Sequence, residues 1–136
     1  MDSEATPEAR RSERTTKVPG PDHPIEIVRV PSRVVVTVAG RVIADSAAAL
    51  ALAEAGHPPV CYLPRRDADM ALLARTGHET WCPYKGACGY YSIPLGGERS
   101  TNAAWTYEAP HPAVAAIAGH LAFYPDRVDS IELRDG

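Results

Sequence analysis

Two pairs of β-forming segments, each interrupted by a tight turn, constrain the fold of this chain more than any other feature. Residues 34–38 and 41–45 are rich in valine and isoleucine, whose branched side chains favour extended backbone. Only Ala39 and Gly40 separate these segments, which is the length of a two-residue hairpin loop. The spacing predicts an antiparallel hairpin.

The second pair predicts a longer hairpin with a testable register. Residues 87–95 and 98–108 flank a double glycine, which is a strong turn signal. A two-residue turn at that point makes Tyr91 face Asn102 across the hairpin. Because side chains alternate between the two faces of a strand, one face then collects Cys88, Tyr90, Ala103, Trp105 and Tyr107. We expect this aromatic face to form either core or the wall of a ligand site.

The remaining segments complete a mainly β pattern. Short strands are expected at residues 60–63, 121–124 and 128–133, and short helices at residues 67–75 and 112–118. Residues 46–55 fit either a helix or an irregular strand. The domain organisation that follows is a flexible charged tail over residues 1–22, which has little to bury, and a single mostly-β domain over residues 23–136, with two or three short helices.

Composition excludes several function classes. The chain has 136 residues and a formal net charge of −3, so no basic surface for nucleic acid is expected. Three cysteines without an apolar leader argue against a secreted disulfide scaffold. No apolar stretch is long enough to cross a bilayer. A reduced, cytoplasmic location is the default expectation, and the sequence does not indicate an oligomeric state.

The loop at residues 81–86 is the first candidate for chemistry. It brings a thiol, a phenol and an amine together at Cys82, Tyr84 and Lys85, between a proline and a glycine that shape the backbone. If residues 78–82 are extended, His78 shares a face with Cys82 and can favour its reactive thiolate. The alternative is that Cys82 is a small buried hydrophobic residue.

Lys85 has two possible roles. Its amine can bind an anionic group or form a Schiff base, or it can pair with Glu79 or Glu108. We favour an anion-binding or ion-pairing role over covalent chemistry, because pairing is the commoner use of lysine.

Several other polar residues each have a structural and a functional interpretation. His57 either locks the turn beside Gly56 or acts as a proton carrier. Arg65 can clamp a carboxylate or phosphate, and Asp67 is expected to cap the helix that follows it. The spacing of Cys61, Cys82, Cys88, His57 and His78 is too loose for a zinc signature, so no metal and no cofactor are predicted.

The order of five motifs resembles a known bacterial family. The motifs are Val42-Ile43-Ala44-Asp45-Ser46, Gly56-His57-Pro58-Pro59-Val60, Tyr62-Leu63-Pro64-Arg65, Cys82-Pro83-Tyr84-Lys85-Gly86 and Asn102-Ala103-Ala104-Trp105-Thr106-Tyr107. The similarity continues through Ile117-Ala118-Gly119 and Phe123-Tyr124-Pro125-Asp126-Arg127-Val128. With these motifs the chain resembles the family of domain of unknown function 427 over residues 34–133.

The resemblance implies a β-tent-like fold of two small antiparallel sheets, which Mss-four-like exchange factors and methionine-R-sulfoxide reductases share. Many members of that fold class hold zinc through two Cys-x-x-Cys pairs, which this chain lacks. A nucleotidyltransferase label sometimes accompanies the family. The sequence has neither a glycine-rich phosphate loop nor a paired aspartate motif to support that activity.

We therefore expect a domain that binds an unidentified small molecule, anionic or planar. Its pocket would lie between the loop at residues 82–86 and the aromatic face of Tyr90, Trp105 and Tyr107, with Tyr84 and Arg65 nearby. An enzymatic version would use Cys82, Lys85, His57 and His78. The alternatives are a non-catalytic protein-interaction module with a flexible tail, and a zinc-stabilised module. A concave cavity beside Lys85 would favour the ligand over the partner protein.

Overall fold

The computed structural model describes residues 16–135, and the chain over these residues is mainly β. The segment assigned to the tail makes contacts from Lys17, whose main-chain N–H donates to the Pro83 carbonyl at 2.9 Å. The remainder of that expected tail, residues 1–15, lies outside the described residues. The strands are β1 Ile25–Arg29, β2 Arg33–Val38, β3 Arg41–Ser46, β4 Leu50–Glu54, β5 Val60–Tyr62, β6 Ala74–Cys82, β7 Gly86–Ser92, β8 Ala104–Thr106, β9 Leu121–Phe123 and β10 Ser130–Arg134.

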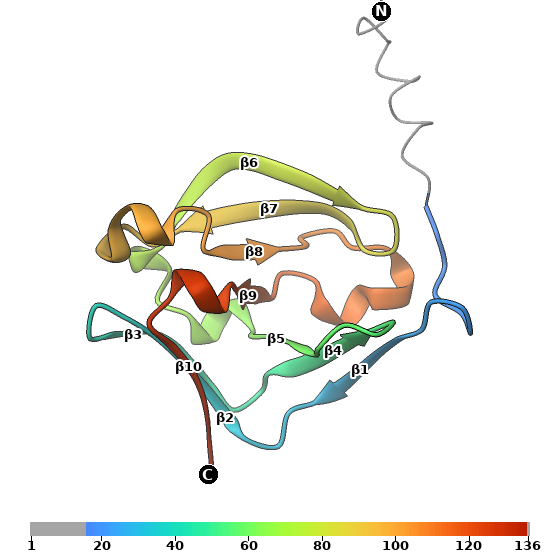
Figure 1. Cartoon of the computed structure of the whole chain (residues 1–136), viewed down its shortest axis with the longest axis horizontal. Coiled ribbons are helices and arrows are strands. Elements are labelled where there is room, and N and C mark those ends of the chain that lie inside the picture. The colour runs from blue at the N-terminus through green and yellow to red at the C-terminus, as the bar shows by residue number, and fades with distance from the viewer. Residues whose placement is uncertain (1–15, 136) are drawn as a thin grey trace, which may run out of the picture.

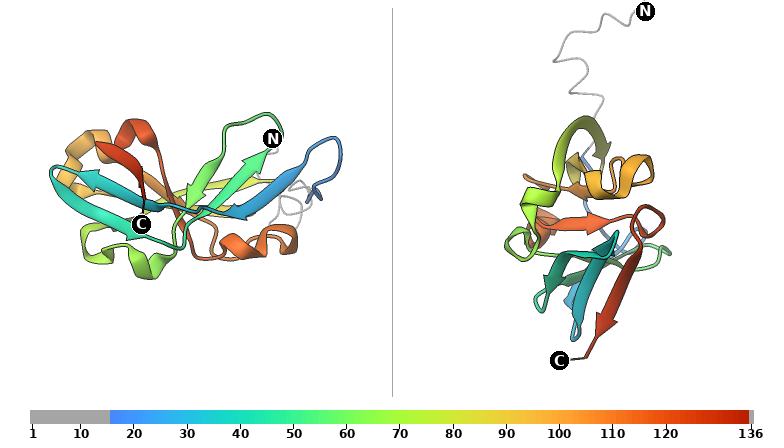
Figure 2. Two further views of the ribbon diagram at one scale, coloured as in Figure 1. Left: turned by 90° about the horizontal axis from the view of Figure 1, so that it is seen from below. Right: turned by 90° about the vertical axis from the view of Figure 1, so that its left-hand side faces the viewer.

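These strands form three antiparallel sheets in place of the expected two. Their orders are β1-β4-β5, β10-β2-β3 and β6-β7-β8-β9. The two sheets that contain β1 and β3 extend to opposite sides beneath the third (Figures 1 and 2). A bridge between Leu63 and Leu121, with two main-chain hydrogen bonds of 2.8 Å, joins β5 to β9. The first and third sheets are therefore continuous at that point.

The hairpin of β2 and β3 confirms the shorter turn prediction, with Val38 paired to Arg41. The longer hairpin differs from its prediction in register. Tyr91 pairs with Ala104 instead of Asn102. The double glycine lies inside a 3₁₀ segment, Pro94–Ser100, where a side chain on Gly96 would collide with Ser100. Gly96 is thus needed for close packing and Gly97 for its positive φ of 68°, and the pair does not form a two-residue hairpin turn.

The helix predictions are only partly right. Residues 112–118 contain the 3₁₀ segment Pro112–Ile117. Residues 67–75 are not one helix, because the short 3₁₀ segments Arg65–Asp67 and Met70–Leu72 are followed directly by β6. Residues 46–55 contain β4, whose main-chain groups pair with both β1 and β5. Sheet pairing on two sides outweighs the helical preference of its alanines and leucines.

The core has two parts that lie on the two faces of the third sheet. Tyr91 and Ile93 pack with the valines of β2 in one cluster. Cys88, Tyr90 and Tyr107 pack in the other, against Leu52 and Tyr62 from the first sheet and the segment that follows β8. The second cluster borders the cavity described below. Within residues 16–135, no helix has the length and apolar character that crossing a membrane requires.

Candidate functional site

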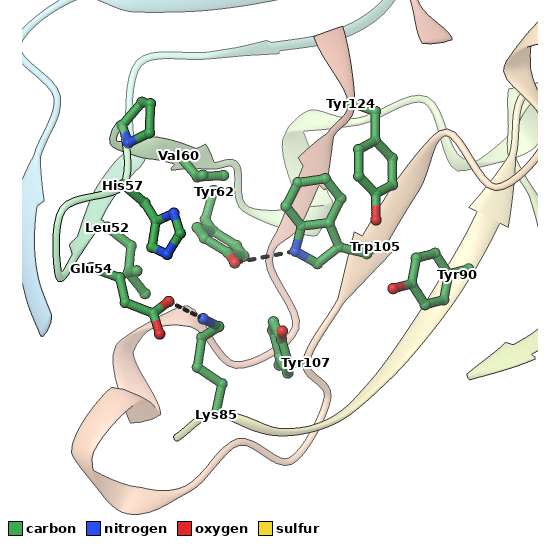
Figure 3. Close-up of a pocket in the computed structure, with 11 residues that line it drawn as sticks. Leu52, Glu54, His57, Val60, Tyr62, Lys85, Tyr90, Trp105, Tyr107 and Tyr124 are labelled. Carbon is green, nitrogen blue, oxygen red and sulfur yellow. Dashed lines mark hydrogen bonds and ion pairs between the residues drawn. The ribbon is translucent and has the colours of Figure 1, made fainter. Parts of the chain in front are cut away.

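A cavity of about 230 Å³ opens between the first and third sheets, and aromatic side chains form most of its wall (Figure 3). Its rings come from β5, β7, β8 and the segments just after β8 and β9. Its polar groups come from the end of β4, the loop after β4 and the turn before β7. The lining residues are Leu52, Glu54, His57, Pro58, Val60, Tyr62, Lys85, Tyr90, Trp105, Tyr107 and Tyr124.

Lys85 enters this cavity from the turn between β6 and β7. The turn is closed by a hydrogen bond from the Lys85 main-chain N–H to the Cys82 carbonyl, and the Lys85 carbonyl accepts one from His111 at 3.0 Å. Gly86 has a φ of +107°, which side chains rarely tolerate, so it permits β7 to start directly after the turn. The Lys85 side chain is only 10% exposed, and its Nζ lies 2.5 Å from Glu54 Oε1. Lys85 thus pairs with Glu54, and the predicted pairing with Glu79 or Glu108 is wrong.

Glu54 connects Lys85 to a second basic residue. Its other oxygen, Oε2, lies 2.7 Å from Nε2 of His23, and the His23 ring stacks on Tyr84 at 3.8 Å. Burial opposes ionisation of Glu54, but the hydrogen bonds from Lys85 and His23 outweigh it and hold the Glu54 pKa below its usual value. An ammonium has three N–H donors, so Lys85 keeps donor capacity for a bound molecule after serving Glu54.

The aromatic wall supplies hydrogen-bond donors as well as ring faces. The Trp105 indole N–H donates to the Tyr62 hydroxyl at 3.1 Å, and the two rings meet edge to face at 89°. The Tyr90 hydroxyl lies 2.9 Å from that of Thr80. Burial raises the pKa of Tyr62, Tyr90 and Tyr107 well above that of a free phenol. These phenols are therefore neutral at physiological pH, and they can donate to acceptor atoms of a ligand.

The chain also matches a known family. The family model described as a domain of unknown function, DUF427, matches residues 26–134. The chain belongs to the DUF427 family. The match confirms the family indicated by the motifs, and it covers the cavity lining in full. No curated protein matches the sequence significantly.

Five of the expected site residues line the cavity of this DUF427 domain. Lys85, Tyr90, Trp105 and Tyr107 do so as proposed from the sequence. His57 lies at the exposed rim, and its main-chain N–H, not its imidazole, closes the turn by donating to the Glu54 carbonyl at 2.8 Å.

Cys82 and His78 do not line the cavity. Both lie on β6, where four residues of extended strand separate them by about 13 Å. The Cys82 side chain packs against the second core cluster, and His78 lies against the ring of Tyr90 at 4.5 Å. The two side chains share a face of the strand but are too far apart to form a nucleophile and its base.

Tyr84 and Arg65 also lie outside the cavity lining. Tyr84 instead supports His23 behind Glu54. Arg65 lies over the ring of Tyr91 and 3.7 Å from Glu108, on another part of the surface. The prediction that Asp67 caps a helix is wrong, because its carboxylate accepts a hydrogen bond from Ser46 at 2.7 Å and makes no cap.

Sequence reasoning missed Glu54, Tyr62, Tyr124 and His23. Glu54 lies in the segment at residues 46–55, whose sequence fits helix or strand equally well, so the direction of its side chain could not be predicted. Tyr62 and Tyr124 fall within motifs of the resemblance, but nothing in their local pattern shows that β5 and β9 lie beside the aromatic hairpin. Only the pairing of the strands could have revealed them.

The three cysteines are free thiols, and burial raises the pKa of Cys61 and Cys88. Over residues 16–135, the DUF427 domain contains no group of three or more His, Cys, Asp or Glu side chains placed to hold a metal ion.

Proposed function

We propose that this DUF427 domain binds a small planar molecule that carries an anionic or hydrogen-bond-accepting group. The observation that carries the proposal is the meeting of a buried Lys85–Glu54 ion pair with a wall of neutral phenols and an indole in one cavity. Ligand sites are typically concave, with hydrophobic and aromatic walls and a few converging polar groups. This cavity combines an aromatic wall with the converging polar groups of Lys85, Glu54 and the tyrosine hydroxyls.

The chemistry of the wall suggests how such a molecule would lie. The Lys85 ammonium is 5.8 Å from the centre of the Tyr107 ring, so it lies over an aromatic face and beside the cavity at once. An acceptor group would take the remaining donors of Lys85, and the flat part of the ligand would pack on Trp105. Glu54 takes one donor of the ammonium, and the other two are available to a molecule bound in the cavity.

An enzymatic version of the proposal would use Lys85 and His57, since both line the cavity. Cys82 and His78 have no comparable access to a bound molecule. The alternative of a protein-interaction module is less well supported, because a concave cavity beside Lys85 suits a small molecule better than a protein surface.

Fluorescence of Trp105 can test the proposal. The chain has two tryptophans, so Trp81→Phe leaves Trp105 as the sole reporter inside the cavity. We expect benzoate to change this fluorescence in a saturable way and to bind more tightly than benzamide, which has the same ring but no charge. Lys85→Met should weaken benzoate at least tenfold, because it also leaves the Glu54 carboxylate facing the probe.

The matched control is Lys17→Met, which removes a lysine near Tyr84 and outside the cavity lining. It should leave benzoate binding unchanged. Native mass spectrometry of protein purified without added ligand provides an independent test, because a retained molecule would reveal its chemical class by mass. Absence of saturable binding together with absence of a retained mass would overturn the proposal.

A further inference from the structure

A second cavity, of about 410 Å³, lies on the other side of β5 and β9. Its walls come from the second sheet and from the outer sides of these two strands, and they are mainly apolar, with Cys61, Leu63, Phe123 and Ile131 among them. Asp129 also lines it, but the carboxylate of Asp129 is already bound by Arg99 at 2.8 Å and by the Ala39 main-chain N–H at 2.7 Å. The chamber therefore offers little to a charged ligand.

The strands between the two cavities pair only briefly. Leu63 and Leu121 exchange two main-chain hydrogen bonds. In a regular antiparallel pair, the next exchange would join Cys61 and Phe123. No hydrogen bond joins these two residues in the part of the chain that the structure describes. The main-chain pairing of β5 with β9 thus ends at Leu63.

The indole of Trp105 lies beside the unpaired part of β5 and β9. Trp105 pairs with Ala122 on β9, and the small Ala122 side chain lets the indole pass over β9 and reach the Tyr62 hydroxyl on β5. Trp105 and Val60 line both cavities. The two cavities are therefore neighbours, and these two side chains lie between them.

We propose that the two cavities form one binding site for an amphiphilic molecule, with a planar anionic head beside Lys85 and an unbranched apolar tail in the second chamber. The inference rests on the proposed function, because it requires the head to occupy the first cavity. The tail would pass beside Trp105, where β5 and β9 share no main-chain hydrogen bonds. Burial of the tail in the apolar chamber drives the additional binding.

A series of 4-alkylbenzoates tests this arrangement, with Trp105 fluorescence of the Trp81→Phe protein as the readout. Benzoate reports the head site alone, and 4-ethyl, 4-butyl and 4-hexyl chains extend toward the second chamber. We expect affinity to rise about fourfold for each methylene that enters the chamber.

Two variants fill the chamber from opposite walls, so that misfolding of one does not leave the question open. Cys61→Phe enters from β5, and Ser130→Phe enters from β10. Each should abolish the dependence on chain length and leave benzoate binding intact. The matched control is Leu133→Phe, which adds a ring on the same strand as Ser130 but at an exposed position outside the chamber.

The outcomes separate the two proposals. If benzoate binds but chain length has no effect, or the effect persists in both chamber variants, the shared site is overturned and the head site remains. If neither benzoate nor the alkylbenzoates bind, the shared site is overturned. The proposed function fails with it when native mass spectrometry also finds no retained molecule.

Discussion

Lys85 and Glu54 are 31 positions apart in sequence, yet each provides the charge that makes burial of the other tolerable. A charged group with no partner in a partly buried place costs free energy, because it loses hydration without a replacement. This dependence makes the pair a structural element as well as a candidate ligand contact. A loss of binding in a Lys85 variant must therefore be separated from a loss of folding.

A double-mutant cycle measures that coupling. Lys85→Met is expected to lower the free energy of unfolding by about 1–3 kcal/mol, since it leaves the Glu54 carboxylate without its main partner. Adding Glu54→Gln should recover part of this loss, so the double variant is more stable than the sum of the single changes indicates. Urea denaturation of the unchanged protein, the two single variants and the double variant gives the four free energies of unfolding.

The exposed Arg134–Glu132 pair is the control, and Arg134→Met there should change stability by less than about 0.5 kcal/mol. Additive effects at Lys85 and Glu54 would contradict the coupling.

Ionisation of Glu54 should contribute to the pH dependence of the protein's stability. Its folded pKa is lower than the ordinary value of 4.5, so its ionised form stabilises the fold. That contribution is fully present above about pH 4.5, and it is lost as the pH falls through the lower folded pKa. Glu54→Gln should therefore lower the melting temperature at pH 7 and make its decline toward pH 3 shallower. Parallel curves for the two proteins would show that Glu54 is not responsible for the acid sensitivity.

At the scale of elements, three neighbouring strands alternate large and small side chains around the cavity. Trp105 on β8, Ala122 on β9 and Tyr62 on β5 are adjacent across these strands, and Ala122 is fully buried between the two rings. The hydrogen bond from Trp105 to Tyr62 depends on the small size of Ala122, which lies between them. The wall of the cavity is thus set by the pairing of strands and not by any one segment.

Ala122→Leu tests this element. The larger side chain would displace the indole, so we expect a loss of about 1–3 kcal/mol from overpacking together with a shift in Trp105 fluorescence. Ala115→Leu, at an exposed position between β8 and β9, is the matched control and should change stability by less than about 0.5 kcal/mol. A stable Ala122→Leu protein with unchanged fluorescence would mean that the indole does not cross β9 as described.

At the scale of the whole molecule, both cavities lie where sheets meet. The Leu63–Leu121 bridge joins the first sheet to the third, and the second sheet closes the other side. Core clusters lie on both faces of the third sheet, so its aromatic residues are held from two sides. This packing restrains the cavity wall, so a ligand bound as proposed would meet a low ordering cost.

Local sequence patterns correctly predicted the mainly β class, the family, the first hairpin and the aromatic face that borders the cavity. These follow from local physics: β-branched runs favour strands, and alternation assigns side chains to faces. The register of β7 and β8 shows how robust that alternation is, because the observed pairing differs from the prediction by two residues. A shift of two keeps every side chain on its face, so Tyr90, Trp105 and Tyr107 still share one wall.

Which of the candidate residues meet could not be predicted from these local patterns. Glu54, not Glu79 or Glu108, neutralises Lys85, and β4 is a strand because β1 and β5 bind its two edges. Cys82 and Lys85 are three positions apart, yet the turn sends one side chain into the core and the other into the cavity. Such choices depend on contacts between segments far apart in the chain, and the free energy of those contacts is absent from any local pattern.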